Sequence, residues 1–234
     1  MQYLPNNTHR IRSFVRRDSR MTSAQLEAYD TQWPRFGLSL LGGMLQHTDT
    51  FGRTAPCYLE IGFGNGQSLL QLAKTHPEAD FIGIETHKPG IGALLLAMSL
   101  QQVTNIRIYH ADAIDVLQHC IKDASLQGAQ LFFPDPWPKR KHHERRLVQS
   151  SLIEILFAKI KTNGSLHLAT DWQDYAKEMV QVMQQSAFVN GFPDHDFAPK
   201  RSMFRPVVTK FEQRAIHEGR CIYELQFIRQ EKHC

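Results

Sequence analysis

The chain has 234 residues, 42% of them hydrophobic, which fits one α/β domain large enough to bury a sizeable core. No apolar run approaches the roughly 20 residues needed to cross a membrane, and the first residues lack the apolar core of a secretory signal. The formal net charge is +4, and the four cysteines form no Cys-x-x-Cys pair. We therefore expect a mildly basic protein of a reducing cytoplasm, without a zinc site or a disulfide framework.

The N-terminal stretch is polar and rich in arginine. We expect a basic, partly flexible extension over residues 1–35, followed by a single domain over 36–234. The arginines of this stretch are Arg10, Arg12, Arg16, Arg17 and Arg20. A second basic cluster spans 139–146. Each run by itself fits a solvated surface as well as it fits binding to a phosphate backbone.

From about residue 56 onward, predicted strands and helices alternate. The predicted strands are 57–61, 80–85, 106–111, 130–134, 165–170 and 221–229. The predicted helices are 67–76, 90–102, 144–161 and 175–186. This alternation predicts an α/β fold with a doubly wound, mostly parallel sheet covered by helices.

A glycine loop with a preceding acid follows the first of these strands. Glu60 stands just before three glycines in a Gly-x-Gly-x-Gly spacing, namely Gly62, Gly64 and Gly66. Such glycines allow a tight turn and a close approach of the backbone to a ligand. The spacing differs from that of a dinucleotide loop, and a carboxylate beside it suits a cationic amine or sulfonium better than a pyrophosphate.

Two more acids fall at the ends of the next two strands, where doubly wound sheets bind their ligands. Glu85 ends its strand and can accept hydrogen bonds from both hydroxyls of a ribose. Asp112 follows the next strand and can accept from the exocyclic amine of adenine, beside the backbone of Ala113. Each acid alone could be a helix cap or a turn residue. Three at successive strand ends favour a nucleoside cofactor.

The sequence FFPDPWPKRKHHERR at 132–146 is the most distinctive segment of the chain. Asp135 lies between two prolines, which predicts a stiff backbone around its carboxylate. A purely structural turn would leave Trp137 and the basic residues behind it unexplained. An aromatic ring and cations beside a rigid carboxylate suit a stacked base held next to phosphates.

Two further segments are LATDW, which places Asp171 at a strand end, and RPVVTKFEQRA at 205–215. With LEIGFGNG, GIE, ADA and the 132–146 segment, they closely resemble the bacterial tRNA (guanine-N7-)-methyltransferase family over about residues 57–228. The resemblance implies a Rossmann-like class I fold, S-adenosylmethionine as cofactor with S-adenosylhomocysteine as product, and tRNA as partner. It further implies methylation of N7 of a variable-loop guanosine by a cytoplasmic monomer or weak homodimer.

The same resemblance implies roles for individual residues and no metal. Asp135 is implied as the catalytic residue. The implied cofactor-binding residues are Glu60, Gly62, Gly64, Gly66, Glu85, Asp112 and Ala113. The implied substrate-binding residues are Lys139, Lys141, His142, His143, Glu144, Arg145, Arg146, Asp171, Thr209, Lys210, Phe211 and Glu212. Pro138 departs from what we expect of the family, but it removes no carboxylate.

Guanine N7 already carries a lone pair, so catalysis should consist mainly of positioning and charge stabilisation. We expect Asp135 to hold the Watson–Crick edge of the guanine and to offset its developing charge, without acting as a general base. His142 and His143 predict that RNA affinity rises at mildly acidic pH. They have no matching ligands for a metal.

Three other functions compete with this interpretation. An amino-methyltransferase of adenine or cytosine would carry its acid before two prolines, whereas Asp135 precedes one. A nicotinamide-dependent oxidoreductase would need a proton donor such as a Tyr-Lys pair, and no convincing pair is present. A non-catalytic RNA-binding module would need the basic surfaces but not three cofactor acids.

Overall fold

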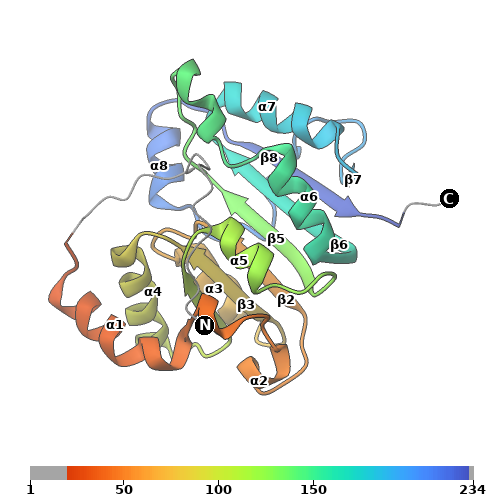
Figure 1. Cartoon of the computed structure of the whole chain (residues 1–234). Coiled ribbons are helices and arrows are strands. Elements are labelled where there is room, and N and C mark those ends of the chain that lie inside the picture. The colour runs from red at the N-terminus through yellow and green to blue at the C-terminus, as the bar shows by residue number, and fades with distance from the viewer. Residues whose placement is uncertain (1–19, 232–234) are drawn as a thin grey trace.

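A single sheet runs through the middle of the molecule in our computed structural model, which describes residues 20–231 (Figure 1). Its eight strands in that range have the order β1-β4-β3-β2-β5-β6-β8-β7. The strands are β1 Gly37–Leu38, β2 Cys57–Ile61, β3 Asp80–Glu85, β4 Ile106–His110, β5 Leu126–Phe132, β6 Ile160–Thr170, β7 Phe188–Asn190 and β8 Tyr223–Arg229. The α-helices are α1 Ser23–Phe36, α2 His47–Phe51, α3 Gln67–Thr75, α4 Lys88–Gln101, α5 Ala113–His119, α6 Ser150–Lys159, α7 Gln173–Gln184 and α8 Lys210–His217.

The strand pairing confirms the predicted doubly wound topology. All neighbours from β1 to β6 in the sheet are parallel, and only β8 and β7 are antiparallel additions. The chain order along the sheet reverses between β2 and β5. In such sheets the switch point at the carboxyl ends of the strands is where a crevice forms.

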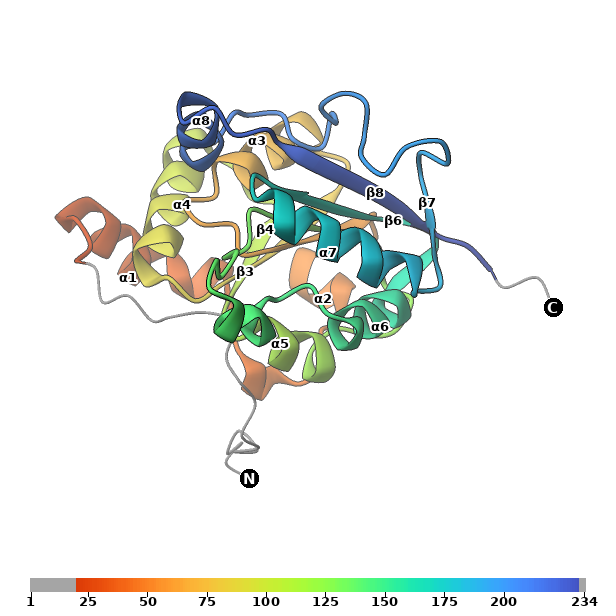
Figure 2. The ribbon, with the colours of Figure 1, turned by 90° about the horizontal axis from the view of Figure 1, so that it is seen from above.

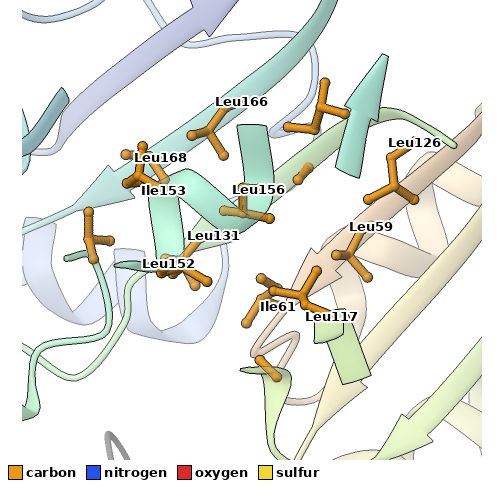
Figure 3. Close-up of a cluster of buried hydrophobic side chains, with 14 of the residues drawn as sticks. Leu59, Ile61, Leu117, Leu126, Leu131, Leu152, Ile153, Leu156, Leu166 and Leu168 are labelled. Carbon is orange, nitrogen blue, oxygen red and sulfur yellow. The ribbon is translucent and has the colours of Figure 1, made fainter. Parts of the chain in front are cut away.

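Helices cover both faces of the sheet (Figure 2). One core lies between the strands and α5, α6 and α7, where side chains such as Leu59, Leu131 and Leu156 pack together (Figure 3). The second core lies under α1, α3 and α4 and includes Ile91, Leu94 and Ile106. These buried apolar side chains come from the runs that the sequence pattern assigned to strands and helices, because both faces of the central strands are covered.

The predicted helix over 144–161 is wrong in its extent. A short 3-10 helix, η2 (Arg140–Arg145), ends at Arg146, whose extended backbone has φ −58° and ψ 133°. The α-helix starts only at Ser150, and the chain is already in β6 from Ile160. The pattern of apolar residues continues past the end of α6 because Ile160, the first residue of β6, is buried like the apolar side chains of the helix.

The predicted boundary at residue 35 is also not a break in the fold. Residues Ser23–Phe36 form α1, which begins with a capping box between Thr22 and Gln25 and buries Ala28 and Phe36. The Thr-x-x-Gln spacing was a usable sequence clue, but the low hydrophobicity of this segment hid the helix. Four arginines of the basic N-terminal stretch, Arg10, Arg12, Arg16 and Arg17, lie outside the described residues. No helix within residues 20–231 is long and apolar enough to span a membrane.

Candidate active site

Five acidic residues meet at one edge of the sheet, as the sequence pattern predicts. Glu60 lies in β2, Glu85 ends β3, and Asp112, Asp135 and Asp171 follow β4, β5 and β6 respectively. Because these strands are parallel, their carboxyl ends share an edge, and the sheet reverses its order between the strands of the first and the fourth acid of this series, β2 and β5. We call this end of the sheet, where the carboxyl ends of the parallel strands meet, the catalytic edge.

The glycine loop turns sharply on the catalytic edge. Gly62, Gly64 and Gly66 have φ of 73°, 58° and 72°, a region that side chains with a Cβ rarely occupy. The turn is fixed by hydrogen bonds from Gly62 N to Ile84 O and from Gly64 N to Glu85 Oε2, both 2.8 Å. A Cβ on Gly62 would meet no atom within 4 Å, so this stretch of backbone faces open space. The loop therefore presents bare backbone to a ligand.

Glu60 is an ionisable group buried without a partner for one of its oxygens. Its exposed fraction is 4%, and within residues 20–231 its Oε2 has no hydrogen-bond partner. Burial and, to a smaller extent, the nearby charge of Glu85 raise the pKa of Glu60 to about 8. A buried carboxyl in this state is costly unless a cation or a donor completes it. It fits a ligand that brings an ammonium or sulfonium group.

Glu85 and Asp112 are held by backbone donors instead. Glu85 Oε1 accepts from the amides of Thr86 and His87 at 2.6 and 2.9 Å, in addition to the bond from Gly64 to its other oxygen. Asp112 is the N-cap of α5 and accepts from Ile114 N at 2.8 Å, so the capping alternative also applies to it. Each carboxylate oxygen can accept about two hydrogen bonds, so Glu85 Oε2, with the one bond from Gly64, keeps acceptor capacity. Ala113, the first residue of α5, is buried.

The loop after β5 contains two residues in strained conformations. Phe133 and Trp137 have φ of 53° and 44°, in the left-handed region that bulky residues avoid. Asp135 lies between them and is exposed. The Trp137 ring packs 5.7 Å from the His142 ring, and the Arg145 guanidinium lies 5.0 Å above it. Strain of this kind persists only where the surroundings fix it, and it clusters at functional sites.

The basic segment 139–146 does not behave as one surface. Lys139, Lys141 and Glu144 are exposed, and His142, His143 and Arg145 are half-buried. Arg146 is only 2% exposed. Its guanidinium pairs with Asp174 and Glu178 of α7, so in this structure Arg146 lies away from the surface that a tRNA phosphate would reach.

The segment 209–212 begins a helix at the rim of the glycine loop. Thr209 is the N-cap of α8 and accepts from Glu212 N at 3.3 Å. Phe211 is 68% exposed, and one of its ring carbons lies 3.9 Å from where a Cβ of Gly64 would stand. Lys210 is also exposed, whereas Glu212 is buried. The exposed Phe211 ring is thus available to a ligand.

Arginine side chains form ion pairs with the other carboxylates on this side of the site. Asp171 accepts from Arg220 Nε at 2.8 Å. Glu212 pairs with Arg201 and with Arg205, whose Nη2 lies 2.6 Å from Glu212 Oε1. A direct contact of buried Glu212 with substrate is not what this arrangement favours.

Sequence reasoning missed a buried cluster beneath the loop over residues 133–146, which we call the catalytic loop. Arg205 is buried, lies 5.3 Å from the Phe133 ring, and pairs with Glu224 of β8. Glu224 in turn is 2.6 Å from His167 Nε2 in β6. The alternation of His167 and Glu224 with apolar neighbours in their strands was the available clue, since a charged residue on a buried face needs a partner.

The chain matches a family of known proteins described as "Putative methyltransferase" over residues 54–225. It is 48% identical over 219 residues to a protein of Nitrosococcus oceani named tRNA (guanine-N(7)-)-methyltransferase, which covers 94% of this chain and 91% of that protein. A protein of the same name from Chromohalobacter salexigens is 46% identical over 223 residues, with 94% and 90% covered.

Solved structures resemble the fold at low sequence identity. A 16S rRNA methyltransferase, KamB, aligns with a TM-score of 0.54 and 14% identity over 77% of this chain and 91% of that one. An antibiotic-related methyltransferase aligns with a TM-score of 0.54 and 13% identity, covering 81% and 94%. These likenesses support the Rossmann-like architecture of the sheet and its helices.

Proposed function

The chain belongs to the tRNA (guanine-N(7)-)-methyltransferase family, and we propose that it transfers a methyl group from S-adenosylmethionine to N7 of a guanosine in tRNA. The observation that carries this proposal is the meeting of the cofactor acids, the strained Asp135 loop and the exposed Phe211 at one edge of the sheet. The products are 7-methylguanosine and S-adenosylhomocysteine.

The cofactor half of the site consists of the glycine loop with Glu60, Glu85 and Asp112. When bound, S-adenosylmethionine supplies a methyl group activated by a sulfonium. The buried Glu60 carboxyl fits the cationic end of that molecule, because its unpartnered oxygen gains a charge-assisted partner there. Glu85 keeps acceptor capacity for ribose hydroxyls, and Asp112 accepts from an adenine amine, with Ala113 at the start of α5 beside it.

Asp135 acts on the guanine. Its carboxylate accepts from N1–H and the exocyclic amine of the base, which orients N7 for an in-line attack. As the purine becomes cationic, the fixed negative charge of Asp135 stabilises it more than it stabilises the neutral base. The stiff, strained loop keeps this charge in place before the reaction starts.

Exposed cations and rings surround this position on the tRNA side. Lys139, Lys141 and Arg145 are placed to meet phosphates, and Phe211 offers a stacking surface. His142, His143, Thr209, Lys210 and Asp171 complete the proposed contact region. We further propose that the enzyme acts as a monomer or weak homodimer in the cytoplasm, whose reducing conditions suit the free thiols of Cys57, Cys120 and Cys221.

The test is methyl transfer from labelled S-adenosylmethionine to an unmodified tRNA transcript, followed by nucleoside analysis. We expect 7-methylguanosine from the wild type. Asp135→Asn should lower turnover by about 100-fold or more, since a fixed charge that stabilises a transition state is worth ~3 kcal/mol. Its cofactor dissociation constant, measured by calorimetry, should change by less than about threefold, because Asp135 lies outside the cofactor half.

Glu154→Gln is the control, since Glu154 is an exposed acid on α6 with no role in the proposed site. A different methylated nucleoside would disprove the proposed substrate atom. Equal losses of turnover and cofactor affinity in Asp135→Asn would disprove the role given to Asp135. Cofactor binding without any methyl transfer to tRNA would disprove tRNA as the substrate.

A further inference from the structure

Arg146 ends the basic segment of the catalytic loop, but its surroundings are those of a core residue. It is among the largest fully buried side chains of the described chain. Its guanidinium lies 4.8 Å from the Tyr175 ring, and the Tyr175 hydroxyl accepts a hydrogen bond from Val148 N at 3.0 Å. A phosphate could reach Arg146 only if this packing opened.

Each nitrogen of the guanidinium has a partner. Arg146 Nε donates to the carbonyl oxygen of Pro136 at 2.9 Å. One terminal nitrogen donates to Glu178, and the other donates to Asp174 Oδ2 at 2.7 Å and lies 3.1 Å from His143 Nε2. The bond from Arg146 lowers the pKa of Asp174, which keeps this carboxylate ionised.

The bond to Pro136 links this buried cluster to the reaction. Pro136 directly follows Asp135 and directly precedes the strained Trp137. A proline has no N–H, so the carbonyl is the only backbone hydrogen-bonding group with which Pro136 can be held. Arg146 therefore ties the loop, one residue from Asp135, to helix α7 in the core.

We propose that Arg146 is a positioning residue, which fixes the Asp135 loop on α7 through Pro136 and does not bind tRNA. The inference rests on the proposed function for the meaning of Asp135. A guanidinium suits this role because its rigid planar fork holds a carbonyl and two carboxylates in fixed directions, whereas the ammonium of a lysine is a compact, rotatable point charge. Its neighbour Arg145, half-buried over Trp137, keeps the contact with phosphate.

The test compares Arg146→Ala with Arg145→Ala in tRNA binding at several salt concentrations and in steady-state methylation. We expect Arg146→Ala to lower kcat by about 100-fold, the scale of a 1 Å misplacement. Its tRNA dissociation constant should stay within about threefold of wild type, with an unchanged salt slope. In Arg145→Ala the slope of log Kd against log salt should fall by about 1. A reduced salt slope in Arg146→Ala would overturn the proposal.

Removing one member of a buried ion pair can also unfold the protein, so a second variant is needed. Arg146→Met combined with Glu178→Met replaces the pair of buried Arg146 and half-buried Glu178 by apolar side chains of similar volume, an exchange that is often neutral for stability. We expect Tm near that of wild type and an intact affinity for S-adenosylmethionine, with kcat still about 100-fold low because Pro136 has lost its donor. Wild-type kcat in this variant would overturn the proposal.

A readout without turnover separates this inference from the proposed function. With 5-fluorotryptophan incorporated, the ¹⁹F resonance of Trp137 should be one line in the wild type and broadened or split in the Met/Met variant. Arg145→Ala should shift that line without splitting it. If wild type made no 7-methylguanosine but the splitting appeared, only the proposed function would fail. A single unshifted line in the Met/Met variant would disprove the tether itself.

Discussion

The carboxylates in the two halves of the catalytic edge have different kinds of partner. On the cofactor half, Glu85 and Asp112 accept from backbone amides, and Glu60 is buried with one oxygen unpartnered. On the other half, which lies around α7 and α8 and which we call the tRNA half, arginine side chains neutralise Asp171, Asp174 and Glu212. One half therefore keeps carboxyl groups without a cationic partner for a ligand, and the other uses its ion pairs to hold loops and helices together.

This difference fits the ligands that we propose for the two halves. A cationic cofactor is stabilised by carboxylates that have no internal counter-ion. A polyanionic RNA would be repelled by free carboxylates, so their pairing with buried arginines leaves the exposed cations to set the surface potential. The ion pairs also fix the geometry, because breaking a buried pair is strongly unfavourable. The halves should therefore respond differently to substitution, pH and salt.

The largest effect in this comparison is expected for Glu60→Gln. The amide keeps the shape of the side chain but removes the charge, so affinity for S-adenosylmethionine should fall about 30-fold or more, which corresponds to ~2 kcal/mol for a lost buried charge partner. Affinity for tRNA should stay unchanged. Calorimetry measures the first quantity and filter binding the second. Glu78→Gln, at an exposed acid beyond α3, is the control.

The same residue predicts how the stability of the ligand-free protein depends on pH. The pKa of Glu60 rises from 4.5 to about 8, mainly because burial disfavours the ionised form. The carboxyl of Glu60 therefore binds its proton more tightly in the folded state than in the unfolded state. The contribution of Glu60 to the stability of the folded state is complete below pH 4.5 and is lost as pH rises toward 8. Tm of the wild type should decline over this window, and the decline should be smaller in Glu60→Gln. Equal slopes in the two proteins would contradict the unpartnered state of Glu60.

A smaller effect is expected on the tRNA half from Arg145→Ala. Loss of one phosphate contact should weaken tRNA binding several-fold near physiological salt and lower the slope of log Kd against log salt by about 1. Affinity for S-adenosylmethionine should be unaffected. Lys74→Ala removes an exposed cation on α3 that bonds to Gln101, so it changes net charge equally without touching the catalytic edge. If both variants changed the slope alike, Arg145 would contribute only to the general potential.

The fold and the cofactor half could be predicted from the sequence because each depends on short-range pattern. Buried parallel strands give continuous apolar runs, and an acid at each strand end reaches the same edge whatever the loops do. The tRNA half could not be predicted to the same extent. Whether Arg146 meets phosphate or Glu178 depends on α7, some thirty positions away, and Glu212 depends on Arg201 and Arg205 from an irregular segment. Composition gives basic residues but not their partners.

The smallest expected effect concerns the two histidines of the basic segment. His142 packs against Trp137, and His143 lies 3.9 Å from Asp174 Oδ2 and 3.1 Å from Arg146. His143 is thus engaged with charged side chains, whereas His142 contacts a neutral ring. We therefore expect tRNA affinity at fixed salt to rise a few-fold from pH 8 to pH 6, the range in which histidine titrates. His142→Gln should abolish most of this rise, and His143→Gln should retain it. An affinity that stays flat between pH 6 and pH 8 would show that neither histidine reaches the RNA and would leave Lys139, Lys141 and Arg145 as its cationic contacts on this loop.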